Sequence, residues 1–66
     1  MIAKVYANGH DTRTVRGTSV EDIARIQFAR HANFTVKHEK GTTWTVTRSF
    51  GADCTGIVGR IRVIEG

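Results

Sequence analysis

Arginine and threonine are the residues of this chain whose chemistry is most informative. The sequence has ten Lys and Arg residues, of which seven are Arg, and nine Thr residues. Guanidinium groups donate several hydrogen bonds in a planar arrangement that matches phosphate oxygens, and hydroxyl groups can donate to the same oxygens. The sequence therefore predicts a phosphate-contacting surface on a sheet face or hairpin, made by Arg13, Arg16, Lys37, Thr43, Thr45, Thr47, Arg60 and Arg62.

The charge balance supports the same prediction. Ten Lys and Arg against six Asp and Glu give a net charge of +4 and a pI near 10.0. A basic domain of this size fits a polyanionic partner, so we expect nucleic acid, and DNA before RNA. Proteins that bind single strands usually expose aromatic side chains for base stacking, and Tyr6 is the one aromatic candidate outside the expected core. We therefore expect duplex DNA.

Two other interpretations stay open. Antiparallel sheets often leave one face in water, and Thr, Lys and Arg suit a solvated face without any partner. Alternatively, the chain is a protein-binding accessory factor or inhibitor, for example phage-encoded, that acts on an acidic surface of a larger host complex. A cluster of exposed apolar residues would mark such an interface or a homodimer. The candidates for that cluster are Tyr6, Ile26, Val58 and Ile64.

Catalytic and metal chemistry have weaker support. His10, His31, His38 and Cys54 match no zinc-binding spacing. The glycine-rich residues 51–59 lack the Gly-Lys-Ser/Thr ending of a phosphate-binding loop and lead into a strand instead of a helix. Nothing in the spacing of the histidines requires acid–base catalysis. We expect a non-enzymatic protein without a metal or cofactor.

The chain of 66 residues is expected to form one α+β domain, residues 1–66, in the cytoplasm. Cys54 is its one cysteine, which excludes an intrachain disulfide and favours a reducing compartment. The N-terminal residues lack the apolar run of a secretion signal, and no segment approaches the ~20 apolar residues of a membrane span. Because small cores stabilise weakly, self-association is also expected.

The first half of the sequence predicts a hairpin followed by a helix. Residues 2–7 form a strand, Asn8 and Gly9 a type I′ turn, and residues 11–17 a return strand at the sheet edge. The helix spans residues 19–31, capped by the Thr18–Glu21 or the Ser19–Asp22 pair. Its buried face comprises Val20, Ile23, Ala24, Gln27, Phe28 and His31, with Ile26 outside this face.

The second half predicts a hairpin and a final strand, giving the order ββαβββ. A three-residue loop at 39–41 would set His38 opposite Thr42 and Val36 opposite Trp44. In the last strand, alternation puts one set of side chains under the helix and the other on the open face. The first set is Ile57, Gly59, Ile61 and Val63, and the second is Val58, Arg60, Arg62 and Ile64. The helix is expected to cover the face formed by Phe34, Val36, Trp44, Val46, Ile61 and Val63.

Overall fold

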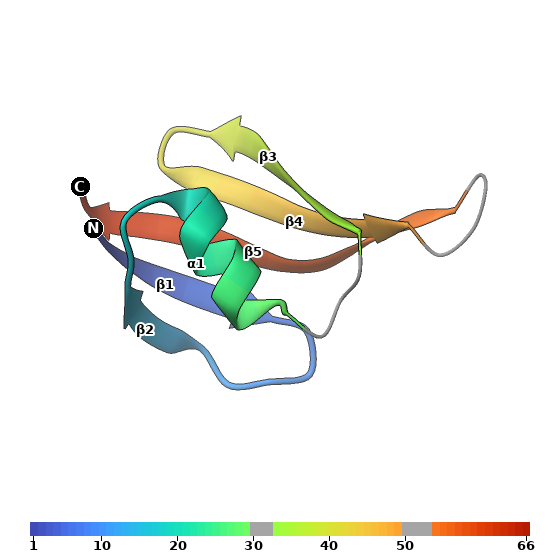
Figure 1. The fold of residues 1–66 in the computed structure, drawn as a ribbon, viewed down its shortest axis with the longest axis horizontal. Coiled ribbons are helices and arrows are strands. Elements are labelled where there is room, and N and C mark those ends of the chain that lie inside the picture. Colours follow the sequence, from blue (N-terminus) through green and yellow to red (C-terminus); the bar gives the residue numbers. More distant parts are fainter. Residues whose placement is uncertain (30–32, 50–53) are drawn as a thin grey trace.

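A computed structural model describes residues 1–29, 33–49 and 54–66, and it has the predicted ββαβββ order. The elements are β1 (Ile2–Ala7), β2 (Arg13–Arg16), α1 (Val20–Gln27), β3 (Phe34–Lys40), β4 (Thr43–Ser49) and β5 (Thr55–Glu65). The strands form one antiparallel sheet in the order β2-β1-β5-β4-β3. The helix packs on one face of this sheet, and the other face is open (Figure 1).

The first hairpin joins the main sheet, with β2 at the edge as predicted and β1 between β2 and β5. The predicted type I′ turn is wrong. Gly9 has positive φ (79°) but Asn8 does not, and the His10 N–H donates to the Ala7 carbonyl at 3.0 Å, which fits a type II turn. Asn8 instead continues the pairing with β5, because its backbone N–H donates to the Val58 carbonyl at 3.0 Å. The return strand is correspondingly shorter than predicted.

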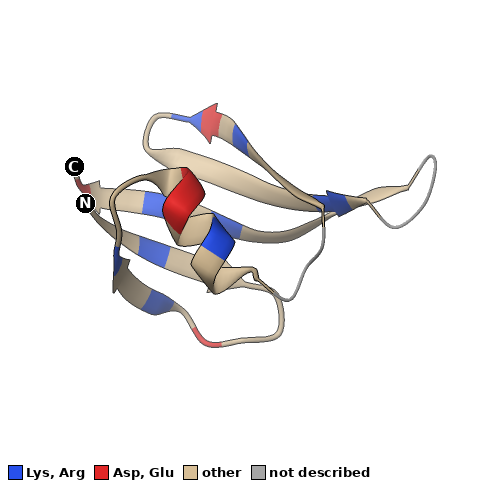
Figure 2. Cartoon of the chain, viewed as in Figure 1, with Lys and Arg blue, Asp and Glu red and all other residues tan. Residues whose placement is uncertain are grey.

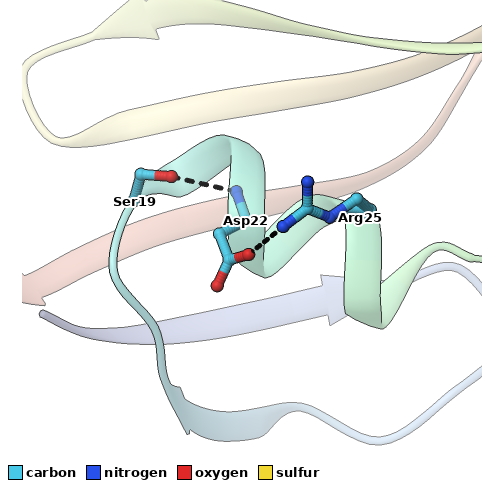
Figure 3. A network of polar contacts seen from close by, with 3 residues as sticks. All are labelled: Ser19, Asp22 and Arg25. Atoms are coloured by element: carbon cyan, nitrogen blue, oxygen red, sulfur yellow. Dashed lines mark hydrogen bonds and ion pairs between the residues drawn. The ribbon is translucent and has the colours of Figure 1, made fainter.

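The helix begins at the second of the two predicted caps. The backbone N–H of Asp22 donates to the Ser19 side-chain oxygen at 3.1 Å, and Arg25 forms an ion pair with Asp22 one turn later (Figure 3). The helix ends at Gln27, four residues before the predicted end, and Phe28 is its C-cap. The predicted terminal residue, His31, lies outside the described residues.

The core lies between α1 and the centre of the sheet. It consists of Ala3, Val5, Val20, Ile23, Ala24, Phe28, Val46, Val58 and Ile61. The predicted buried face of the helix is confirmed for Val20, Ile23, Ala24 and Phe28. Ile26 lies outside this face as expected, with 61% of its surface exposed. The helix packs mainly against β5, so it covers the β3–β4 end of this face less completely. Phe34, Val36, Trp44 and Val63 pack against the core but are only half-buried.

The predicted register of the second hairpin is wrong by two residues. His38 lies opposite Trp44 and Val36 opposite Val46. The turn consists of Gly41 and Thr42, with Gly41 at φ 54°, and the register shift between His38 and Lys40 is a β-bulge. A two-residue turn alone would put apolar side chains on both faces. The extra residue of the bulge restores the alternation, so the apolar residues still share one face.

A second bulge, in β5, changes the predicted faces of two residues. Gly59 pairs with Val46 and Ile57 with Thr47, so Val58 is the extra residue. Val58 is therefore buried, with 7% of its surface exposed, whereas Ile57 is 48% exposed on the open face. Gly59 lies directly under the Phe28 ring. A Cβ atom at this position would be 2.5 Å from Phe28 Cζ and 2.5 Å from the Tyr6 carbonyl oxygen.

Gly59→Ala is expected to lower the free energy of unfolding by about 1–3 kcal/mol, because the added methyl group overlaps a buried ring and a backbone oxygen. Urea denaturation followed by circular dichroism measures this change. Gly66→Ala is the matched control, since a Cβ there meets no atom within 4 Å. Equal stabilities of the two variants would contradict the packing of Phe28 on Gly59.

Candidate nucleic-acid interface

The open face of the sheet carries two rows of polar side chains across its central strands. Arg62 of β5 lies opposite Thr43 of β4 and Lys4 of β1. Arg60 of β5 lies opposite Thr45 and Tyr6 in the same way. Side chains of directly opposed residues share a face, and their neighbours Val5 and Ile61 are buried under the helix. Both rows therefore face away from α1.

Most of the predicted site residues share this face. Lys37 lies opposite Thr45, and Thr47 lies opposite Ile57. Arg16 is two residues from Thr14, whose partner is Lys4, so Arg16 extends the face to the edge strand. The residues of the predicted set that the open face brings together are Arg16, Lys37, Thr43, Thr45, Thr47, Arg60 and Arg62.

Arg13 does not belong to this group. Its strand partner is Val5, a core residue, so its side chain lies on the helix side of the sheet. There it lines a small pocket of about 260 Å³ together with His10 and Ile26. Arg13 was predicted to share one surface with the other site residues, but it lies on the opposite side of the sheet from the open face.

The predicted set left out several residues of the open face, of which Lys4, Tyr6 and Ile57 matter most for the site. Lys4 and Tyr6 alternate with the buried Ala3 and Val5 in β1, and this pattern was readable from the sequence. Ile57 reaches the open face through the β5 bulge, which no local sequence signal reveals. Tyr6 is 37% exposed, so the basic face does contain an aromatic ring.

A shallow pocket of about 530 Å³ lies at the centre of this face. Tyr6 and Ile57 give it an apolar surface, and two guanidinium groups and a hydroxyl group stand around them. Its lining includes Tyr6, Asn8, Thr43, Ile57, Arg60 and Arg62. The pocket therefore combines the apolar and cationic groups that a flat, negatively charged ligand requires.

Glu39 places a carboxylate beside the basic residues. It projects from the β3 bulge, where its Oε2 accepts a hydrogen bond from the Thr45 hydroxyl at 3.0 Å. The Arg60 Nε lies 3.8 Å from the same oxygen, and both side chains are about half-exposed. An ion pair of this kind is weak in water, so the Arg60 guanidinium remains available for a stronger partner.

The charges are distributed unevenly between sheet and helix (Figure 2). Each of the five strands carries at least one Lys or Arg, whereas the first turn of α1 carries Glu21 and Asp22. The acidic residues at the helix N-terminus complement its dipole and lie on the side away from the open face. Most of the positively charged residues therefore lie on the sheet.

The weaker candidate sites are not assembled. The sequence allows His10, Arg13, Arg16 and Glu39 to be combined into an acid–base site, but the structure divides these four residues. His10 and Arg13 line the pocket on the helix side, whereas Arg16 and Glu39 face away from the helix. Within residues 1–29, 33–49 and 54–66, no three His, Cys, Asp or Glu side chains are grouped closely enough to hold a metal ion. Cys54 is exposed. His31, a member of the zinc hypothesis, lies outside the described residues.

Comparison of the chain with protein-family models, curated proteins and solved structures gives no significant match. In the described part of the chain, no helix is long and apolar enough to cross a membrane. The interpretation of the site therefore rests on its geometry and charge.

Glu39→Gln is expected to tighten the binding of a short oligonucleotide two- to fivefold, because it removes a negative charge beside Arg60. The amide oxygen of Gln can still accept the Thr45 hydrogen bond, so the bulge should be retained. Fluorescence anisotropy with a labelled oligonucleotide measures the change. Glu21→Gln makes the same charge change on the helix, and an equal gain from this control would contradict a local effect of Glu39.

Proposed function

We propose that this protein is a non-enzymatic nucleic-acid-binding module that uses the open face of its sheet. The observation that carries the proposal is the alignment of Lys4 with Arg62 on neighbouring strands, next to an exposed pocket that Arg60 and Arg62 line. Arg16 and Lys37 extend the positive charge toward the two edge strands. Such an arrangement matches the extended negative charge of a phosphate backbone.

The threonines have a supporting role in this function. Thr43 lies beside Arg62 and lines the pocket, so its hydroxyl can donate to a phosphate oxygen bound by that guanidinium. Thr45 is different, because it is 9% exposed and already donates to Glu39. We therefore assign Thr45 a positioning role for the Glu39 side chain and expect no direct contact with the ligand.

The number of cations sets the expected salt dependence. The open face carries six basic side chains, because Lys40 lies opposite Thr43 and joins Lys4, Arg16, Lys37, Arg60 and Arg62. Six phosphate contacts would give a slope of log affinity against log salt of at most about −4.2 for a single strand, at about −0.7 per contact. Binding should therefore be easily detected at low salt and weaken strongly toward physiological salt.

A protein-binding function is the second candidate, and one observation favours it. Phe34 and Val36 of the edge strand β3, and Trp44 of its neighbour β4, are only half-buried on the helix side. A partner could add a strand to β3 and cover these side chains. The four residues expected to mark a protein interface give mixed support. Val58 is buried and Tyr6 lies within the basic face, whereas Ile26 on α1 and Ile64 on β5 are exposed.

Arg60→Ala combined with Arg62→Ala is expected to weaken oligonucleotide binding at least tenfold at low salt and to reduce the salt slope by about 1–2. The physical reason is the loss of two phosphate contacts. Both side chains are exposed, so the fold should be retained, which circular dichroism checks. Anisotropy across a salt series, with light scattering on the same samples, provides the affinities and the oligomeric state.

The matched control is Arg13→Ala combined with Arg25→Ala. It removes the same charge from the helix side, where Arg25 lies on α1 and Arg13 faces away from the open surface. We expect a smaller loss of affinity and an almost unchanged slope. An equal loss in both double variants would show that net charge alone drives binding and would contradict a binding site on the open face. Absence of binding by the unaltered protein at low salt would shift the assignment to the protein partner.

A further inference from the structure

We infer that the pocket at Tyr6 and Ile57 holds one unpaired base, so that the open face selects single-stranded nucleic acid over duplex. This inference rests on the proposed function and specifies its ligand. It departs from the duplex DNA expected from the sequence, and two features of the face carry it: its width and its exposed aromatic ring.

The width of the sheet disfavours insertion of the open face into a groove of undistorted B-DNA. Neighbouring strands lie 4.7–4.9 Å apart, so the outer strand axes of a five-stranded sheet are about 19 Å apart. The major groove of B-DNA is about 12 Å wide and admits a helix or a two-stranded ribbon. The open face as a whole is therefore too wide to reach base edges inside an undistorted duplex. A single strand has no such restriction, because its bases can turn toward the sheet.

Tyr6 provides the stacking surface. Its side chain lies on the open face, directly opposite Arg60 in the strand pairing, and lines the pocket together with Ile57. Nucleobases stack on exposed aromatic rings irrespective of their sequence, because every base has a π face. The volume of about 530 Å³ is in the range of small-ligand pockets, so one nucleoside fits.

The polar groups around the ring match the rest of a nucleotide. Arg60 and Arg62 are two residues apart on β5 and can contact the phosphates on either side of the stacked base. Asn8 is held in place by its Nδ2–H, which donates to the Ile57 carbonyl at 2.7 Å. Its amide oxygen can accept a hydrogen bond from a base edge. The pocket thus offers stacking, charge and one hydrogen-bonding group to a single nucleotide unit.

The test uses the intact protein with three probes: a labelled mixed-sequence single strand of DNA, the matching duplex, and a nucleoside monophosphate as competitor. We expect the single strand to bind at least tenfold more tightly than the duplex of equal length. Tyr6→Phe keeps the ring and should bind within about twofold of the unaltered protein, whereas Tyr6→Leu should lose about 5- to 100-fold. Ile26→Ala removes exposed apolar surface from the helix and is the control.

The salt dependence separates this inference from the proposed function. Tyr6→Leu should lower the affinity without changing the salt slope, because stacking releases no counterions. If the duplex binds as tightly as the single strand, or if Tyr6→Leu binds normally while the salt slope stays steep, the base pocket is wrong and the basic face stands. If the monophosphate binds as tightly as the strand, the pocket serves a free nucleotide instead. If neither strand form binds at low salt, the proposed function and this inference both fail.

Discussion

The packing of Phe28 on Gly59 is the contact on which the rest of the structure depends. The ring leaves no room for a side chain at position 59, and the bulge beside it turns Val58 into the core and Ile57 to the open face. Without that bulge, alternation would bury Ile57 and expose Val58. Beyond the bulge, the alternation of β5 puts Ile61 under the helix and leaves both arginines on the opposite face. The bulge next to this close contact thereby adds Ile57 to the candidate binding surface.

The sequence was sufficient to predict what depends on local periodicity. The order of elements, the helix stripe around Ile23 and Phe28, and a Ser19 cap all follow from spacing. The sequence was insufficient to predict the strand register where two local features compensate each other. In the second hairpin, a two-residue turn and a bulge at Glu39 together preserve the apolar face, so the apolar pattern alone could not distinguish this register from the predicted one. The prediction of a type I′ turn at Asn8 and Gly9 was wrong. The Asn8 backbone N–H instead donates to the Val58 carbonyl of β5, a long-range hydrogen bond that the local sequence does not indicate.

The candidate site was predictable to a similar degree. Strand alternation correctly grouped Arg60 and Arg62 with the threonines of β4, because both strands are regular there. It could not exclude Arg13, since the register of the first hairpin was undetermined. The apolar part of the face was missed because Ile57 reaches it through a bulge, whereas Tyr6 was noted as an aromatic candidate but not included in the predicted site. The aromatic and apolar contribution of Tyr6 and Ile57 changes the expected ligand, since a flat basic face with a stacking ring suits a single strand and a purely polar one does not.

The most direct measurement is a map of amide chemical-shift changes in ¹⁵N-labelled protein during titration with a mixed-sequence single strand. Binding through the open face predicts the largest changes at Tyr6, Thr43, Arg60 and Arg62, on three strands that are distant in sequence but adjacent in the sheet. Residues of α1 and the Arg13 region should change little, because they lie on the other side. The largest changes in α1 or around Trp44, or no changes at saturating concentration and low salt, would contradict nucleic-acid binding by this face.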